Sequence, residues 1–133
     1  MKYNNDFKHD LSVGQVGEKH LGDLLTGKTI EVKMDFGAFK TGNVYIEYSS
    51  RGKLSGLATS TASFWAIYIM SESGERLQDN PMLKMNPHDI ENIIMVSTDK
   101  LKNIVKQKAF RKKVKGGDNN TSLGCLIKVK DLV

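Results

Sequence analysis

Apolar residues recur at helical spacing near the start of the chain and predict a helix over residues 11–25. Asp10 stands where an N-cap is expected, and residues 1–9 are expected to form a flexible N-terminus. One stripe of the helix contains Leu11, Gly14, Leu21 and Leu25. Glu18 falls on the same stripe. A carboxylate that faces a core must be paired or bound to a metal, so Glu18 is a candidate functional residue.

The next segment, residues 29–36, alternates in the manner of a half-buried strand. One row consists of Ile30, Val32, Met34 and Phe36, and the other consists of Glu31, Lys33 and Asp35. After a turn signal at residues 41–43, a second alternation sets Val44, Ile46 and Tyr48 against Tyr45, Glu47 and Ser49. The two segments are predicted to form a hairpin. If its register places Asp35 and Glu47 opposite each other, their side chains lie about 5 Å apart on one face.

The rest of the chain predicts a small α/β protein. Residues 64–70 form the longest apolar run, which is typical of a buried strand, and Trp65 within it is expected to belong to the core. Other expected elements are a short helix at 57–63, a polar connection at 74–87, a strand at 93–96, a helix capped by Ser97 with Leu101, Ile104 and Val105 on its apolar side, a turn at 116–120 and a strand at 125–129. We expect a central mixed sheet with helices on its two sides.

Composition favours one domain spanning residues 1–133, because 39% hydrophobic residues suffice for a modest core. The single cysteine, Cys125, cannot form an internal disulfide, and no apolar run approaches the roughly 20 residues of a membrane-spanning helix. We therefore expect a cytoplasmic protein without a membrane role. The histidines are scattered and no phosphate-binding loop motif occurs, which argues against a zinc site and a nucleotide-binding fold.

Basic residues concentrate in the C-terminal third of the chain. Lys and Arg number 20 against 15 for Asp and Glu, and the excess lies mainly between Lys100 and Lys115. Such a segment can contact phosphates, although a solvated helix face is an equally good interpretation. The candidate nucleic-acid-binding residues are Lys108, Arg111, Lys112, Lys113 and Lys115, together with Arg51 and Lys53 in the loop at 49–56.

The polar rows of the two predicted strands suit phosphodiester hydrolysis. This reaction needs a divalent cation, and hard cations such as Mg²⁺ prefer carboxylate oxygens, which Asp35 and Glu47 supply. Lys33 shares their face and is suited to assist the attacking water or to stabilise developing charge. Glu18 is suited to complete the metal shell, and Glu31 is a further candidate. The alternative for the strand residues is an ordinary amphipathic strand that shows its charges to solvent.

The order of a helical Glu, a strand Asp and a later strand Glu resembles that of the PD-(D/E)XK nuclease superfamily. Four segments are also similar to small phage-encoded members of it. They are residues 30–35, 41–48, 50–56 and 116–120. The resemblance covers most of residues 10–132, and its specificity comes from the combination of motifs, because the core signature is short.

The resemblance implies a restriction-endonuclease-like α/β core and an Mg²⁺-dependent DNA endonuclease, for which Mn²⁺ can substitute. It implies that Asp35, Glu47 and Glu18 bind the metal and that Lys33 takes part in catalysis. Small members without a separate recognition domain often act as homodimers on branched DNA. A Holliday junction resolvase is therefore the expected role, followed by a homing or restriction-type endonuclease. A phage-encoded protein of this kind acts in the cytoplasm of a bacterial host.

The chain departs from the family pattern at Ser49, because a lysine normally stands two residues after the glutamate. We interpret Lys33 as its relocated equivalent and keep Ser49 as a further candidate site residue. A second alignment takes Glu31 and Lys33 as Glu-x-Lys and Asp23 as the preceding Asp, but it leaves Glu47 unused. Two other function classes stay open, a nucleic-acid-binding relative that does not cut and an assembly protein whose basic face binds a protein partner.

Overall fold

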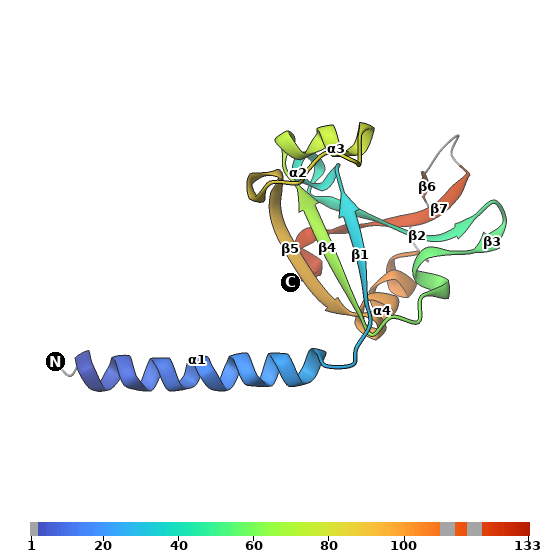
Figure 1. Cartoon of the computed structure of the whole chain (residues 1–133). Helices are drawn as coiled ribbons and strands as arrows, with labels where there is room; N and C mark the ends of the chain where they lie inside the picture. Colours follow the sequence, from blue (N-terminus) through green and yellow to red (C-terminus); the bar gives the residue numbers. More distant parts are fainter. Residues whose placement is uncertain (1–2, 110–113, 117–120) are drawn as a thin grey trace.

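The computed structural model describes residues 3–109, 114–116 and 121–133, with side chains placed for 9–107, 115–116 and 121–133. The fold is mixed α/β, with two small sheets and a long helix (Figure 1). The helices and strands are α1 (Tyr3–Leu25), β1 (Ile30–Asp35), α2 (Ala38–Thr41), β2 (Asn43–Ser50), β3 (Lys53–Leu54), β4 (Phe64–Met70), α3 (Arg76–Asp79), β5 (Ile90–Ser97), α4 (Thr98–Ala109), β6 (Val114–Gly116) and β7 (Ser122–Lys128). The 3-10 turns include η1 (Gly56–Thr59), η2 (Glu72–Glu75), η3 (Pro87–Asp89) and η5 (Val129–Asp131).

The strands fall into two sheets instead of one central sheet. Sheet A has the order β1-β4-β5, with β1 parallel and β5 antiparallel to β4. Sheet B is antiparallel and has the order β3-β2-β7-β6. The predicted hairpin of β1 and β2 is therefore wrong, because the two strands lie in different sheets and α2 connects them.

β1 alternates as predicted, but its apolar row is the exposed one. Val32 is 57% exposed, and Ile30 and Met34 are exposed as well, whereas Asp35 is only 6% exposed. The polar row faces sheet B, where Asp35 accepts a hydrogen bond from the backbone of Tyr45 in β2. The more buried face of β1 is therefore the polar one, whereas the hydrophobic residues had suggested that the apolar face is buried.

The hydrophobic core lies between the two sheets and is closed by α4. The fully buried apolar side chains include Val44, Ile46, Ile67, Leu101 and Ile127. They come from β2, β4, α4 and β7, and they form one contiguous cluster. Burial of this cluster fixes β2 with its other face, which carries Tyr45 and Glu47, turned away from the core.

Several local predictions are confirmed. β4 coincides with the predicted strand at 64–70, and β5 and β7 include the strands expected at 93–96 and 125–129, apart from Val129. The backbone N–H of Lys100 donates to Ser97 Oγ at 3.2 Å, as expected for a helix cap. Trp65 is buried, and its indole N–H donates to Ser60 Oγ at 3.2 Å. In place of the helix expected at 57–63, the structure has the shorter 3-10 turn η1.

The N-terminal helix differs most from expectation. α1 begins at Tyr3, so Asp10 is an internal residue and not the cap. The helix extends away from the sheets (Figure 1), and its described side chains are exposed up to Leu24. Glu18 is therefore exposed, and the expectation that it faces the core is wrong, because the apolar side of α1 does not pack on the core. No helix in the described ranges is long and apolar enough to cross a membrane.

Candidate functional site

A cleft of about 440 Å³ lies between the edges of β1 and β2. β1 contributes Glu31 and Lys33 to its lining, and β2 contributes Tyr45 and Glu47. β1 is an edge strand of sheet A. β2 pairs with β7 on one side, and on its other side it pairs with β3 only at Ser49 and Ser50. Two strand edges thus present charged side chains to one space. Three of the predicted site residues meet there.

Asp35 lies at the end of β1, in the lining of an adjoining cleft of about 410 Å³ that also includes Lys33 and Tyr45. Its Oδ1 accepts hydrogen bonds from the backbone N–H groups of Gly37 (3.0 Å) and Ala38 (2.8 Å) at the start of α2. Its Oδ2 accepts one from the backbone N–H of Tyr45 (3.1 Å). Asp35 therefore joins α2 and β2 to β1. These bonds use three of the about four lone-pair sites of an ionised carboxylate.

Glu47 is half-buried on the opposite wall, where the hydroxyl of Ser55 donates to its Oε2 at 2.9 Å. The pairing of β2 with β7 shifts register between Glu47 and Ser49, which indicates a β-bulge. Bulges re-aim side chains and are common beside active sites. Gly56 has a φ of +52°, and a Cβ there would meet the Glu47 carbonyl oxygen. The loop around Ser55 and Gly56 thus fixes Glu47 at the cleft.

Tyr45 forms the wall between the two carboxylates. Its hydroxyl shares a 2.8 Å hydrogen bond with Ser122 Oγ. A Cβ at Gly116 or at Gly124 would lie 2.7 Å from Tyr45 Cζ, so the ring can approach β6 and β7 only because both residues are glycines. Lys33 Nζ lies 5.9 Å from the centroid of this ring, within the range of a cation–π contact. The aromatic ring therefore helps to hold the lysine at the cleft.

Asp35 and Glu47 do not lie opposite each other in a hairpin. Asp35 contacts the nitrogen of Tyr45, and Glu47 follows two residues later on the same face of β2, about 7 Å further along the strand. Oxygens that bind one Mg²⁺ lie within roughly 4 Å of each other, because each is about 2.1 Å from the ion. Glu47 would have to leave Ser55 and rotate towards Asp35 for both to bind one ion.

The donor chemistry of the two clefts suits a hard cation. Within the described ranges, no group of three or more His, Cys, Asp or Glu side chains is close enough to hold a metal ion. Mg²⁺, however, usually takes only one or two carboxylates and completes its shell with water and phosphate oxygens. Glu31 and Glu47 line the same cleft, whereas Asp35 lines the adjoining one and joins Glu47 at an ion only after Glu47 turns away from Ser55.

The other predicted site residues lie outside the cleft. Glu18 lies on the exposed α1, and the half-buried Ser49 pairs with Leu54 and Leu123 in sheet B. Neither residue is part of the lining of either cleft. The structure therefore separates both of them from the carboxylates with which they were grouped.

Exposed basic residues flank the site in the part of the chain that is described. Arg51 and Lys53 lie at the turn that joins β2 to β3, and Lys115 lies on β6. Arg51 and Gly52 have φ angles of 52° and 78°, which fits a two-residue type I′ turn. Four other predicted basic residues fall outside the described side chains, namely Lys108, Arg111, Lys112 and Lys113. Residues 117–120 of the predicted turn are also outside the described ranges.

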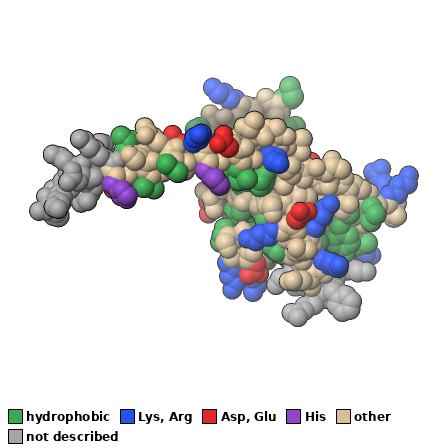
Figure 2. Space-filling model, turned by 90° about the horizontal axis from the view of Figure 1, so that it is seen from below, with side chains coloured by type: hydrophobic (Ala, Val, Ile, Leu, Met, Phe, Trp, Pro, Cys, Tyr) green, Lys and Arg blue, Asp and Glu red, His purple; other side chains and the backbone are tan. Residues whose placement is uncertain are grey.

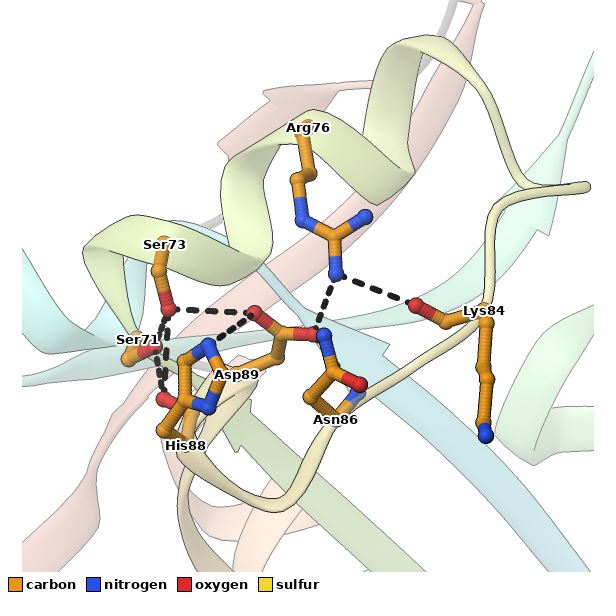
Figure 3. Close-up of polar contacts among 7 residues, drawn as sticks. All are labelled: Ser71, Ser73, Arg76, Lys84, Asn86, His88 and Asp89. Atoms are coloured by element: carbon orange, nitrogen blue, oxygen red, sulfur yellow. Dashed lines mark hydrogen bonds and ion pairs between the residues drawn. The ribbon is translucent and has the colours of Figure 1, made fainter.

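A second buried carboxylate, Asp89, lies where η3 meets β5 (Figure 3). Its Oδ2 accepts from Arg76 Nη2 and from the backbone N–H of Asn86, both at 2.7 Å, and its Oδ1 accepts from Ser73 Oγ at 3.0 Å. The Asn86 N–H is the main cause that holds the pKa of Asp89 below its ordinary 3.8, and Ser73 and Arg76 act in the same direction, against burial. Ser73 Oγ donates to Asp89 Oδ1 and to the backbone carbonyl of His88 (3.2 Å) instead of to the His88 imidazole, so the group lacks the order of a nucleophilic triad. The cluster fastens the connection between β4 and β5.

Four residues of the site were not predicted as site residues from the sequence. They are Tyr45, Ser55, Gly56 and Ser122. Ser55 and Gly56 belong to the segment at 50–56 that resembles phage nucleases, so a signal was present. Tyr45 and Ser122 are 77 residues apart in the sequence, and no local sequence pattern predicts their contact.

Comparison with models of known protein families, with curated proteins and with solved structures found no match. The cleft residues and the sequence resemblance are therefore the basis for a functional assignment.

Proposed function

We propose that this chain is an Mg²⁺-dependent endonuclease that hydrolyses phosphodiester bonds of DNA at the cleft between β1 and β2. The observation that carries the proposal is that Glu31, Lys33 and Glu47 line one cleft, with Asp35 in the lining of the adjoining one. Carboxylates beside a lysine are the groups that metal-assisted hydrolysis of a phosphodiester requires. The PD-(D/E)XK superfamily, which the sequence resembles, uses the same combination.

Glu47 and a carboxylate of β1 would hold the ion. A bound Mg²⁺ supplies Lewis acidity towards the phosphate and lowers the pKa of a coordinated water. Asp35 has one lone-pair site beyond its three backbone hydrogen bonds, and Glu31 lines the same cleft as Glu47. Glu47 with either residue provides the two carboxylates, and the position of Asp35 in the resemblance favours Asp35.

Lys33 is suited to stabilise the charge that develops on the phosphate. It stands between Glu31 and Asp35 on β1, and it is the charged residue that lines both clefts. Contact with the ring of Tyr45 holds its ammonium at the cleft wall, from which it donates to a phosphate oxygen. This placement supports Lys33 as the substitute for the family lysine, whose usual position is occupied by Ser49.

The β2–β3 turn is suited to hold the DNA backbone beside the site. Arg51 and Lys53 are exposed at this turn, which begins just after the end of β2, the strand that carries Glu47. Arg and Lys that contact phosphates position a nucleic acid without reading its sequence. Lys115, exposed on β6, is a further phosphate-contacting candidate, and the sequence adds the basic residues at 108–113.

The substrate we propose is branched DNA, cut by a homodimer in the manner of a Holliday junction resolvase. A homing or restriction-type endonuclease is the next candidate. Both roles, and action in the cytoplasm of a bacterial host, come from the resemblance to small phage-encoded PD-(D/E)XK nucleases. Fold class alone does not select between branched and linear DNA.

The test is cleavage of labelled four-way junction, linear duplex and single-stranded DNA with Mg²⁺, and with Mn²⁺ as its substitute. Wild type is compared with Glu47→Gln, Lys33→Met and the matched control Glu91→Gln, an exposed carboxylate of β5 outside both clefts. We expect Glu47→Gln and Lys33→Met to slow junction cleavage at least about 100-fold, and Glu91→Gln to cut like wild type. Binding to the junction should persist in all variants.

A nucleic-acid-binding module that does not cut is the second candidate. The three backbone hydrogen bonds to Asp35 favour it, because they give this carboxylate a structural task. Absence of cleavage with either metal, together with salt-dependent DNA binding, would establish this alternative. Weak binding that does not respond to salt would instead indicate an assembly protein with a protein partner.

A further inference from the structure

The outer face of sheet A is an open apolar surface. Ile30, Val32 and Met34 of β1 and Ile93 and Met95 of β5 flank Ala66 of β4 on it. The register places Val32 and Met95 on either side of Ala66, so these side chains form a continuous row across the sheet. Val32, Ile93 and Met95 are 57%, 47% and 45% exposed. A contiguous apolar sheet face of this kind marks an interaction surface.

The helix α1 has an apolar surface of its own. One side of the helix carries Val13, Leu21, Leu24 and Leu25 at helical spacing, and Leu11 and Glu18 lie together at its margin. Figure 2 shows hydrophobic side chains exposed along the helix where it extends from the body. Gly14, Gly17 and Gly22 each weaken the helix by about 1 kcal/mol relative to alanine. Because helices in proteins depend mainly on packing of an apolar face, α1 requires a partner surface.

Hydrogen bonds at both ends of its linker direct α1 away from its own sheet. The backbone N–H of Thr26 donates to Gly22 O (3.0 Å), and that of Lys28 donates to Leu25 O (3.1 Å), around Gly27 with its φ of +70°. At the other end, the backbone N–H groups of residues 63 and 64 both donate to the carbonyl of residue 29. These hydrogen bonds hold the linker in the conformation that points α1 away from its own sheet, whereas the sheet of another molecule is open to it.

We propose that the outer face of sheet A binds α1 of a second copy of this chain, so that two copies exchange their helices reciprocally. The dimensions agree: residues 11–25 form about 22 Å of helix, and a strand of six to eight residues is about 20–26 Å long. Exchange creates two identical helix-on-sheet contacts. The dimer therefore buries twice the surface of one contact, which brings it closer to the roughly 1,600 Å² of total buried surface in a stable interface. Exchange of an identical element is a low-cost route to a dimer.

The exchange uses no residue of the proposed catalytic machinery. Glu31 and Lys33 alternate with Val32 along β1 and therefore point to the other side of the strand. Val32 and Met34, against which the helix would pack, also line the clefts, so the docked helix lies at their margin. The existence of the dimer is independent of whether the chain cleaves DNA.

The experiment measures the mass of the full chain by sedimentation equilibrium, with Leu21→Asp on the helix and Met95→Lys on the sheet. We expect a dimer for wild type, and a dimer dissociation constant raised at least about 100-fold for each variant, because each buries an unpaired charge. Ser12→Asp is the matched control, since Ser12 is exposed on the polar side of α1 near Lys19, and it should remain dimeric.

Mixing the two variants supplies the decisive outcome. In the mixture, the intact helix of the Met95→Lys chain meets the intact sheet of the Leu21→Asp chain, and the second contact joins Asp to Lys. Dimers should therefore reappear, which also shows that both variants are folded. A monomeric wild type, or a Met95→Lys variant that stays dimeric, overturns the proposal in favour of closure within one chain or of helix-to-helix pairing.

Discussion

Two buried aspartates, Asp35 and Asp89, are held in similar ways but meet different surroundings. Asp35 accepts three backbone hydrogen bonds, and Asp89 accepts one from Asn86 and one from Ser73. Arg76 lies 2.7 Å from Asp89 and neutralises its charge inside the protein. For Asp35, no ion pair occurs among the described side chains, and Lys33 lines the cleft beside it.

The difference shows how one residue type can serve two purposes. A buried carboxylate that already pairs with a cationic side chain has its charge balanced, as Asp89 has with Arg76 (Figure 3). A carboxylate held only by backbone dipoles at an open cleft keeps the ability to attract a cation. On this basis Asp89 is a structural fastener and Asp35 is a candidate ligand.

The largest expected effect separates the two aspartates by activity. Asp35→Asn should slow DNA cleavage at least about 100-fold, because an amide is a poor ligand for Mg²⁺. Asp89→Asn should leave the rate within roughly threefold of wild type at a temperature where the variant is folded. Initial cleavage rates of both variants, beside circular dichroism spectra, provide the measurement. Equal losses in both would mean that Asp35, too, is only structural.

The next largest effect is expected in acid, where the Asp89 cluster should lose its contribution to stability. The pKa of Asp89 is held below its ordinary 3.8, chiefly by the Asn86 N–H, so its contribution to stability is complete above that value and is lost as the pH falls through the lower pKa of the folded state. The gap in unfolding free energy between wild type and Asp89→Asn should therefore be constant at neutral pH and shrink below about pH 4. Urea titrations at several pH values measure it, and a gap that widens in acid would contradict the assignment.

The third largest effect is expected when the packing against Tyr45 is disturbed. Gly124→Ala places a Cβ against the ring of Tyr45 and the carbonyl of Ile46, so we expect a loss of about 1–3 kcal/mol of unfolding free energy. Gly17→Ala is the matched control, because no atom lies near its Cβ and alanine favours the helix. Chemical denaturation of both variants tests this wall of the cleft. An unchanged Gly124→Ala would mean that the ring is not held there.

The smallest effect concerns the β2–β3 turn. Arg51 has a φ of 52°, which asparagine tolerates better than arginine, so Arg51→Asn should add up to about 1 kcal/mol of stability. It should also weaken DNA binding and lower the slope of affinity against salt by about one contact. Thermal denaturation and binding at several salt concentrations measure the two changes. A variant that gains stability without losing affinity would remove Arg51 from the DNA-binding surface.

The sequence predicted those elements whose signals are local. The apolar run of β4, the Ser97 cap of α4 and the alternation of β1 are all properties of a few neighbouring residues, and the structure confirms them. Strand pairing could not be read in the same way. A turn signal at 41–43 suggested a hairpin, but β1 pairs in parallel with β4, and such a pairing requires a long crossover that leaves no local pattern.

The candidate site was predictable to a similar degree. Alternation placed Glu31, Lys33 and Asp35 on one face, and the structure keeps them together because a strand has a two-residue period. Glu18 was misplaced because an apolar stripe on a helix does not say which surface it will meet. Tyr45, which separates the two carboxylates, depends on glycines in β6 and β7 and could not be foreseen.

Binding of a divalent cation at the cleft between β1 and β2 is tested most directly by titrating the protein with Mn²⁺ and measuring bound ion by electron paramagnetic resonance. We predict one Mn²⁺ per chain for wild type and for Asp89→Asn, displaced by Mg²⁺, and binding weakened at least about tenfold in Glu47→Gln. Binding that Glu47→Gln leaves unchanged, or no binding by wild type, would contradict the account.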